Sequence, residues 1–371
     1  MNNSIRLLPA LLLAFSFNLQ PLLAQKGIAL ANKSANHVER QALVQDVIPL
    51  ARLANERLAY MKDVAAYKWA KRLPTASART TIKVGYPPVS TSLPLFVAIE
   101  EGLFKEKGLN IESVQYETAN QIVDALAAGE IQATSVCADY PWLSLAVEDD
   151  EAFRIYAWEI LDTLIPFDLI LSRPGSGIHT LADLEGKTIA TFPGSQLKHY
   201  LELILEKALG WMPEVTIIEM APADQIPALA SGKVDALFTL EPMALMAVLQ
   251  GVGQIVESSP ISKYIGGGQP MPAASFALST TFIKEHSQTA KKFVQAMDKA
   301  IRMINKDQEQ YRYLYPRFTN ITAELAGKIP VTHFTTVRDM DISLFQKEAD
   351  ILFKAGLLER RMEVKKLIYS Y

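Results

Sequence analysis

The stretch ALAAGEIQAT at positions 125–134 recurs almost unchanged as ALASGKVDAL at positions 228–237. In each copy, a segment of helical composition ends at a glycine, Gly129 or Gly232, and a segment of strand composition follows. Glycine is the expected end of a helix, because it adopts the left-handed conformation without steric cost. The two copies therefore predict the same helix-to-strand corner at two places in the chain.

The segments around each corner also repeat in the same order. For the first copy we expect strands at 81–86, 110–116 and 131–137, with helices at 93–104 and 119–129. For the second copy we expect strands at 187–192, 214–220 and 233–240, with helices at 196–209 and 223–232. Strands that alternate with helices indicate parallel βαβ units. The repeat of the whole order favours an α/β fold with two similar lobes.

The bulk composition restricts the possible functions. The chain has 371 residues, which favours more than one domain. The net charge is −3 and no basic block stands out, so nucleic acid is not an expected partner. The single cysteine, Cys137, cannot form a disulfide within the chain. The five histidines show no metal-ligand spacing, so we expect neither a metal nor a cofactor.

Residues 1–24 are typical of a secretory signal peptide. Arg6 supplies a positive charge, and the apolar run from Leu7 to Phe17 is shorter than the roughly 20 residues that span a bilayer. A small residue, Ala24, precedes the expected cleavage site. No cysteine follows the run, so we do not expect a lipoprotein. The alternative is an uncleaved membrane anchor.

Residues 25–80 predict a helical extension and a linker. Apolar side chains recur at three-to-four-residue steps within 38–73, which indicates one amphipathic helical segment. The stretch PTASART at 74–80 has the composition of a linker. After the two repeats, an apolar return strand is expected from Ala273, followed by a long amphipathic helix and a mostly helical tail.

Residues 81 to about 367 resemble the periplasmic substrate-binding proteins of ABC importers for nitrate, alkanesulfonates, taurine and thiamine pyrimidine precursors. The matching stretches are VGYPPVSTSLPLFVAIEEGLFKEKGLNIE, ALAAGEIQATSV, LADLEGKTIATFPGS, ALASGKVDALFTLEP and FQKEADILFKAGLL. The resemblance implies a type-II periplasmic-binding-protein fold. Lobe 1 would comprise 81–170 plus 273–371, and lobe 2 would comprise 171–272. It also implies a periplasmic location, a small-molecule ligand in the interlobe cleft, hinge closure, and an ABC permease in the inner membrane as partner.

Physical reasoning predicts the same ligand position. In open α/β sheets, ligands bind beyond the carboxyl ends of the strands, where helix N-termini offer free N–H groups. The expected ligand-binding residues in these loops are Ser90, Thr91, Asn120, Cys137, Asp139, Tyr140, Asp162, Gly194, Ser195, Gln196 and Glu241. The loop Gly194-Ser195-Gln196 is the sharpest of them, because glycine allows close approach of the backbone.

Structural roles are the alternatives for most of these residues. Ser90 and Thr91 suit an ordinary turn, and Asn120 suits a helix cap. Cys137 suits a small buried hydrophobe, and Glu241 a hinge. The candidate loops contain no arginine, which favours a small organic ligand that is polar or weakly anionic over a strongly charged one.

Two enzymatic functions remain as alternatives to solute binding. Residues 43–79 resemble the first long helix of secreted chorismate mutases, through the words ERL, DVAAYKW and LP. Arg57 and Lys68 fall where that family has cations that hold the substrate's carboxylates. The later helices of that family are missing, so we expect a remnant or a docking helix with at most residual activity.

The second alternative is a dehydratase of the prephenate or arogenate type on the same two-lobed fold. It would need an acid in the cleft, and the candidates are Asp139, Asp162 and Glu241. We expect a binding protein rather than an enzyme, with no catalytic residues.

Overall fold

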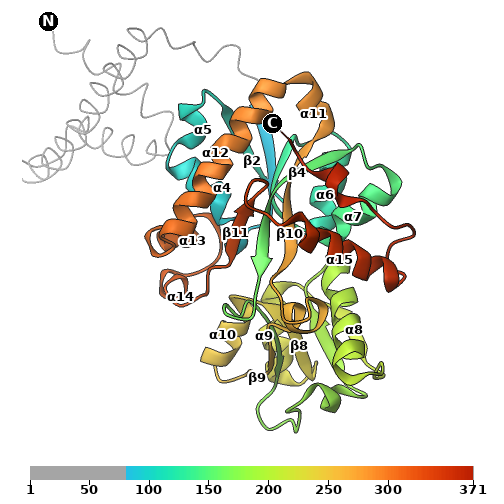
Figure 1. The fold of residues 1–371 in the computed structure, drawn as a ribbon. Coiled ribbons are helices and arrows are strands. Elements are labelled where there is room, and N and C mark those ends of the chain that lie inside the picture. Colours follow the sequence, from blue (N-terminus) through green and yellow to red (C-terminus); the bar gives the residue numbers. More distant parts are fainter. Residues whose placement is uncertain (1–80, 371) are drawn as a thin grey trace, which may run out of the picture. The chain divides into compact units, whose positions relative to one another are not determined.

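The computed structural model describes residues 81–370, which belong to one compact unit that extends from Arg79 to Tyr371 (Figure 1). The expected signal peptide, the helix expected at 38–73 and the linker lie outside the described residues. Within the described residues, no helix combines the length and the apolar character that crossing a bilayer requires.

Two mixed β-sheets organise the described unit, one in each lobe. The first sheet has six strands in the order β11-β4-β10-β3-β1-β2. Its strands are β1 (Thr81–Tyr86), β2 (Asn110–Gln115), β3 (Ala133–Ala138), β4 (Phe153–Leu161), β10 (Met271–Ser279) and β11 (His333–Thr336). β1 pairs in parallel with β2 and β3, whereas β10 runs antiparallel to both β3 and β4.

The second sheet repeats this plan with five strands in the order β7-β6-β8-β5-β9. Its strands are β5 (Asp168–Ser172), β6 (Thr188–Thr191), β7 (Thr216–Glu219), β8 (Ala236–Leu240) and β9 (Gln254–Ser258). β6 pairs in parallel with β7 and β8, and β5 runs antiparallel to β8 and β9. The chain passes between the sheets twice, after β4 and before β10.

The duplicated corner has the same hydrogen bonds in both lobes. Gly129 and Gly232 have positive φ angles of 78° and 76°. The carbonyl of Ala125 accepts the N–H groups of the two residues that follow Gly129, at 2.9 and 3.4 Å. The carbonyl of Ala228 does the same after Gly232, at 3.0 and 3.3 Å. The recurring letters of the sequence therefore encode one local structure twice.

Helices flank both sheets. Those of the first sheet are α4 (Leu93–Glu100), α5 (Leu103–Glu106), α6 (Ala119–Ala127), α7 (Asp139–Glu148), α11 (Thr280–Glu285), α12 (Ser287–Lys306), α13 (Tyr315–Phe318), α14 (Ala323–Ala326) and α15 (Ile342–Lys354). Those of the second sheet are α8 (Ser195–Leu209), α9 (Pro222–Ser231) and α10 (Met243–Leu249). Short 3₁₀ turns lie at Ser90–Ser92, Leu181–Leu184, Glu309–Leu314 and Val364–Leu367, and a π-helical turn, η4, at Ile261–Ile265.

Two expectations about the elements need correction. The helix expected at 93–104 is broken into α4 and α5, because Gly102 adopts a positive φ of 68°. The tail that was expected to be mostly helical also contains β11, which adds a strand to the edge of the first sheet. This strand has only four residues and takes its stability from pairing with β4, so its own sequence carries little signal.

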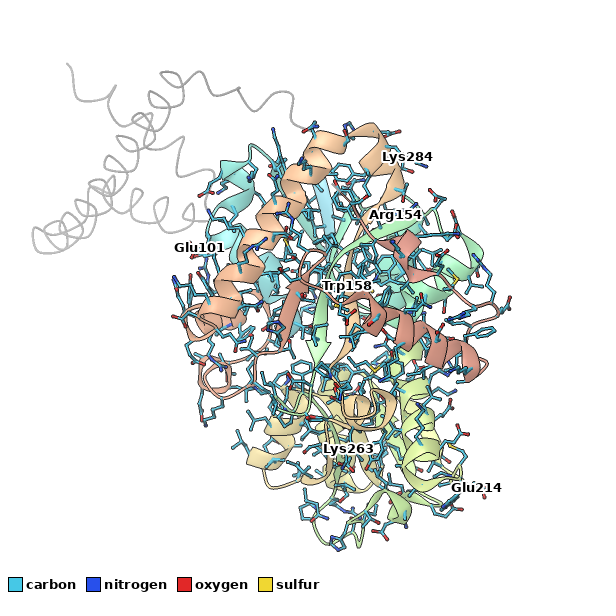
Figure 2. All side chains as sticks on the ribbon, viewed as in Figure 1. Glu101, Arg154, Trp158, Glu214, Lys263 and Lys284 are labelled. Carbon is cyan, nitrogen blue, oxygen red and sulfur yellow. The ribbon has the colours of Figure 1, made fainter. Side chains whose placement is uncertain are left out.

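Apolar packing continues from the first lobe into the second. Trp142, Trp158 and Phe345 of lobe 1 are fully buried, and Tyr200 of α8 is buried in the same cluster. Trp158 lies on β4, between the strands β11 and β10 of the first sheet (Figure 2). Helix α8 therefore packs against lobe 1 while its own strand, β6, belongs to lobe 2.

Candidate functional site

Loops from the two lobes meet where β3 and β6 end. β3 leads directly into α7, and β6 leads through residues 192–194 into α8. Helices α7 and α8 contact each other, so the carboxyl ends of these two strands face a common region. Neither N-cap position provides a side-chain hydrogen bond, because they are Ala138 in α7 and Gly194 in α8.

Gln196 joins the two lobes directly. Its side-chain oxygen accepts the backbone N–H of Tyr140 at 2.6 Å, and its side-chain nitrogen donates to the carbonyl of Ala273 at 2.8 Å. Tyr140 lies in the first turn of α7 and Ala273 on β10. The buried side-chain amide of Gln196, in lobe 2, thus accepts a free N–H group in the first turn of α7 and donates to β10, both in lobe 1.

Gly194 brings the chain of lobe 2 close to α6 of lobe 1. Its φ is 113°, and a Cβ atom at this position would stand 3.4 Å from the Asn120 side-chain oxygen. Asn120 does not cap its helix, since Thr118 and Gln121 form the capping box of α6. The nearby Cys137 is buried, and its thiol donates to the Ala119 carbonyl at 3.4 Å.

Tyr140 lies between α8 and the C-terminal segment. Its ring centre is 4.9 Å from that of His199 on α8, and its hydroxyl donates to the Leu357 carbonyl at 3.2 Å. The ring is partly buried. It therefore packs against both lobes beside the Gln196 bridge.

Asp139 is completely buried beneath these residues. Its carboxyl group accepts a hydrogen bond from the Ser275 hydroxyl on β10. Burial raises the pKa of Asp139 to about 7, although the hydrogen bond from Ser275 acts in the opposite direction. Asp139 is thus enclosed by protein groups and does not face solvent.

The three predicted hydroxyl residues differ in burial. Ser90 and Thr91 are buried in the 3₁₀ turn that packs against β3, and no protein group bonds the Ser90 hydroxyl. Ser195, the first residue of α8, is partly exposed. These positions hold polar groups near the region where the two lobes meet.

The carboxylates of Asp162 and Glu241 accept hydrogen bonds from backbone N–H groups a few residues further along the chain. Asp162 accepts the backbone N–H groups of Leu164 and Ile165, at 2.7 and 2.8 Å, in the turn that leaves β4. Glu241 accepts the N–H of Leu245 at 3.0 Å and so caps α10. Burial raises the pKa of Glu241 to about 7. Neither carboxylate bonds another predicted site residue.

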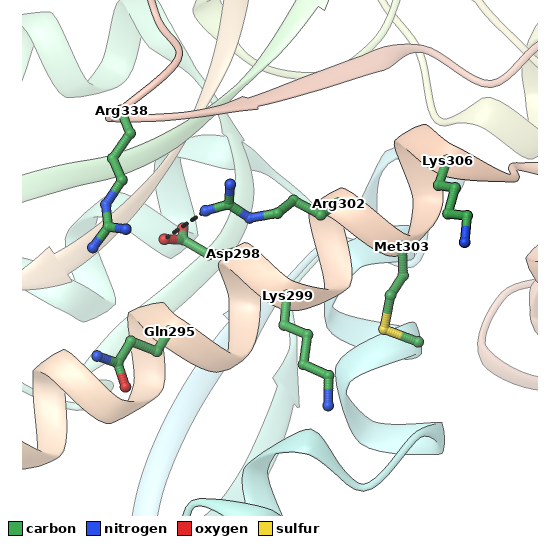
Figure 3. A pocket seen from close by; sticks show the side chains of 7 residues that line it. All are labelled: Gln295, Asp298, Lys299, Arg302, Met303, Lys306 and Arg338. Carbon is green, nitrogen blue, oxygen red and sulfur yellow. Dashed lines mark ion pairs between the residues drawn. The ribbon is translucent and has the colours of Figure 1, made fainter.

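Two cavities in the described part of the chain lie away from the predicted residues. One, of about 360 Å³, is lined on α12 by Gln295, Asp298, Lys299, Arg302, Met303 and Lys306, and also by Arg338 (Figure 3). The other, of about 580 Å³, lies between the end of β2 and α6. The predicted residues around Gln196 line neither cavity. Among them, Gln196 and Asp139 are buried, Gly194 and Ser195 are partly exposed, and Asn120 is exposed.

Two residues of this region were missed by sequence reasoning. Tyr200 of α8 and Glu348 of α15 are fully buried, and the tyrosine hydroxyl donates to the Glu348 carboxyl group. The available signal was the position of Glu348 on the apolar face of its helix, between Phe345 and Leu352. A carboxylate in an apolar stripe predicts a buried polar contact.

A family model matches more than half of this chain. Residues 90–311 match the family model described as "NMT1/THI5 like". A relative is the putative aliphatic sulfonates-binding protein of Bacillus subtilis (strain 168). It is 23% identical over 288 residues, which cover 74% of this chain and 82% of the relative.

Solved structures show the same fold at lower identity. The alkanesulfonate-binding protein SsuA from Xanthomonas axonopodis pv. citri, bound to MOPS, superposes with a TM-score of 0.64 at 20% identity and covers 79% of this chain and 99% of its own. The periplasmic nitrate-binding protein NrtA from Synechocystis PCC 6803 gives 0.60 at 17% identity, with 78% and 85% covered. The two-lobed periplasmic-binding-protein fold is confirmed. The resemblance of 43–79 to chorismate mutase receives no support from these matches and lies outside the described residues.

Proposed function

Because the chain belongs to the NMT1/THI5-like family of ABC substrate-binding proteins, we propose that it captures a small solute between its two lobes and delivers it to an ABC importer. The observation that carries this proposal is the meeting of strand-end residues from both lobes at the Gln196 bridge. A site shared by two lobes can couple ligand binding to their closure. The lobe limits expected from sequence, 170/171 and 272/273, stay part of this proposal, and they fall inside β5 and β10, the strands that follow the two passages between the sheets.

The proposed contacts to the solute come from both lobes. Helix α8 is 15 residues long, and its first turn has no side-chain cap, so its N–H groups and partial positive charge suit a polar or anionic group. Ser195 would add a hydroxyl, and Asn120 an amide from the opposite lobe. The buried Ser90 hydroxyl, which no protein group bonds, would supply a further polar contact from lobe 1.

The proposed ligand is a small organic molecule with a polar or weakly anionic group. The loops that contain the predicted residues have no arginine, and Lys198 is exposed one turn into α8. Backbone N–H groups and hydroxyls would then carry the recognition. The names of the relatives, which include sulfonate-binding and nitrate-binding proteins, support oxyanion-bearing molecules as the first candidates.

Each acid considered for a dehydratase is engaged by the protein itself: Asp139 with Ser275, Asp162 with its own turn, and Glu241 with α10. The proposed location is the periplasm, as in the name of the nitrate-binding relative. The proposed partner is a permease of the inner membrane.

A thermal-shift screen tests the proposal. The panel contains alkanesulfonates, MOPS, taurine, nitrate, bicarbonate, thiamine pyrimidine precursors, chorismate and prephenate, each added to the mature chain from Gln25. A ligand at one hundred times its Kd adds about 2.7 kcal/mol to the free energy of unfolding. We expect a shift with one importer-type solute, which is recovered unchanged. Chemical conversion of chorismate or prephenate would contradict the proposal.

A further inference from the structure

Helix α12 carries a row of basic side chains on its outer face. The row consists of polar residues at steps of three or four, namely Lys292, Gln295, Lys299, Arg302 and Lys306. Residues at such steps share one face of a helix, and this row spans about 20 Å. The opposite face of α12 is apolar and packs in the core of lobe 1, whereas the four cations of the row are exposed.

Two further cations join this row from other elements. Lys107, which directly follows α5, donates to the side-chain oxygen of Gln295 at 3.1 Å. Arg338, from the turn after β11, lines the cavity of about 360 Å³ together with three cations of α12 (Figure 3). The dipole of α12 favours cations only in its own last turn, so it does not explain a gathering that involves three elements. We call these five cations of α12 and its neighbours, with Lys299, the basic face.

Acidic side chains offset only part of this charge. Asp298 is the one acid on α12, and its carboxylate is buried with Oδ2 4.0 Å from Arg302. Glu106 lies 3.0 Å from Lys299, but both side chains are about half exposed, and water weakens such a pair. Within the described residues, Lys292 and Lys306 have no acidic partner. The basic face therefore keeps a net positive charge.

The charge of this face is opposite to that of the surrounding protein. Residues 81–371 contain more acidic than basic side chains, whereas α12 contains five basic residues and one acid. Like charges three or four residues apart destabilise a helix. A local arrangement that opposes stability is expected where function requires it.

The composition of the basic face favours a lipid surface over a protein partner. Protein interfaces are enriched in aromatic residues and depleted of lysine. Three of the five residues in the row are lysines, and none of the five is apolar. Met303, which is partly buried, is the apolar residue that lines the cavity. Lipid phosphates form an extended anionic surface, and a row of exposed lysines matches it in charge and shape.

We propose that the basic face of α12 adsorbs electrostatically to the surface of an anionic phospholipid bilayer. Charge attraction supplies the contact, and no apolar side chain inserts, because the row presents none. The negative charge of the remaining surface acts from further away and is screened by salt beyond about 8 Å. This inference goes beyond the proposed function, since adsorption needs no solute. It would hold the chain beside the membrane that contains the proposed permease.

Co-sedimentation with lipid vesicles tests this inference in the chain from Gln25, without solute. One set of vesicles contains about one third phosphatidylglycerol in phosphatidylcholine, and the other set contains phosphatidylcholine alone. We expect binding to the anionic vesicles only, at about 0.1 M salt. Raising the salt to about 0.5 M should abolish this binding, because the screening length then falls to a few ångströms.

A triple variant of α12 tests the position of the contact. It removes three charges from the row by the changes Lys292→Gln, Lys299→Gln and Lys306→Gln. Glutamine forms helices nearly as well as lysine, so α12 should stay folded. Each cation near an anionic surface strengthens binding about fivefold, so the variant should bind about a hundredfold more weakly.

A matched control removes three exposed lysines of lobe 2 by the changes Lys207→Gln, Lys233→Gln and Lys263→Gln. The net charge changes equally, and one exposed ion pair is lost in each variant, here that of Lys263 with Glu257 at 2.8 Å. The control should bind nearly as the parent does. The basic residues of 25–80 are present in all three proteins, so their contribution cancels from the comparison.

The inference is overturned if the parent does not bind anionic vesicles, or if it binds both kinds of vesicle equally. It is also overturned if the α12 variant binds as tightly as the parent. Binding to immobilised polyglutamate without binding to vesicles would assign the basic face to an acidic protein instead. Release from the vesicles by inorganic phosphate at constant ionic strength would reduce the face to a site for a small anion, against the proposal.

A double variant keeps the test valid if the triple variant fails to fold. Lys292→Gln with Lys306→Gln breaks no ion pair among the described residues and should bind about 25-fold more weakly than the parent. Unchanged binding of this double variant would overturn the inference by itself. None of these outcomes depends on the identity of the solute, so they are separate from the test of the proposed function.

Discussion

The side chain of Gln196 on α8 accepts the backbone N–H of Tyr140 on α7 at 2.6 Å, across the boundary between the lobes. With its second bond, to the Ala273 carbonyl at 2.8 Å, it ties lobe 2 to both a helix and a strand of lobe 1. This residue stands in the sharpest loop expected from sequence.

Gln196→Ala should destabilise the protein and weaken ligand binding. Each lost hydrogen bond contributes about 1 kcal/mol, so we expect a loss of about 2 kcal/mol in the free energy of unfolding. The solute found in the screen should bind about tenfold more weakly, because the lobes lose part of the contact that favours their joined state. Denaturant titration and calorimetry measure the two effects. Lys198→Ala, exposed on the same helix, is the control, and equal results for both variants would refute the bridge.

Ser195→Ala should weaken ligand binding and leave the folded state intact. Ser195 is the first residue of α8 and is partly exposed, so removal of its hydroxyl should change the free energy of unfolding by less than about 0.5 kcal/mol. A hydrogen bond to the solute contributes about 1 kcal/mol, which corresponds to roughly a fivefold change in Kd. An unchanged Kd would remove this loop from the site.

Gly194→Ala should harm both stability and binding. Its φ of 113° is unfavourable for a residue with a side chain, and the new Cβ atom would lie in van der Waals contact, 3.4 Å from the side-chain oxygen of Asn120 in lobe 1. The matched control is Gly210→Ala at the other end of α8, where φ is 76° and no atom lies within 4 Å. We expect both variants to lose stability, by about 1 kcal/mol or more, but only Gly194→Ala to raise Kd. A rise in both would show that general strain is the cause.

Stability should fall as pH rises from about 4 to about 8. Burial raises the pKa of Glu159 from 4.5 to about 8, and that of Asp168 from 3.8 to about 7. The folded protein therefore holds these protons more tightly than the unfolded chain, so raising the pH through this window favours unfolding. Each group contributes a slope of up to about 1.4 kcal/mol per pH unit within its window.

Denaturant titrations at a series of pH values measure this slope. Glu159→Gln should reduce it, because the amide has no proton to lose. Asp341→Asn is the control, since Asp341 is exposed and hydrogen bonds from the hydroxyl and then the N–H of Ser343 lower its pKa. A slope that is unchanged in Glu159→Gln would contradict the titration assigned to Glu159.

The ends of the helices and the positions of most strands could be predicted from sequence, because short-range patterns determine them. Gly129 and Gly232 end their helices with the same left-handed turn, and the strands on either side fall close to the expected positions. The antiparallel placement of β10 between β3 and β4 did not follow, since it depends on partners more than a hundred residues away. Strand order is set by the packing of the whole sheet, which no single segment encodes.

Part of the candidate site could be predicted from sequence, because the residues that follow strands or begin helices are identified by short-range patterns. Gly194, Gln196, Asn120 and Tyr140 follow strands or begin helices, so the strand-end rule predicted that they belong to one region. Asp162 and Glu241 satisfy the same rule, yet each carboxylate closes its own turn or helix. Glu348, which accepts the Tyr200 hydroxyl of α8, comes from α15 far along the chain, and only the tertiary fold brings these two residues together.

The central claim is that a solute is captured between the lobes, and energy transfer between dyes at Lys284→Cys and Glu214→Cys, with and without saturating solute, tests it most directly. The solute is the one identified by the thermal-shift screen, at a fixed pH of 7. We predict that, at saturation, the transfer efficiency shows a single narrow distribution. Its mean should be higher than the mean efficiency without ligand. An identical distribution with and without bound solute would contradict capture by lobe closure.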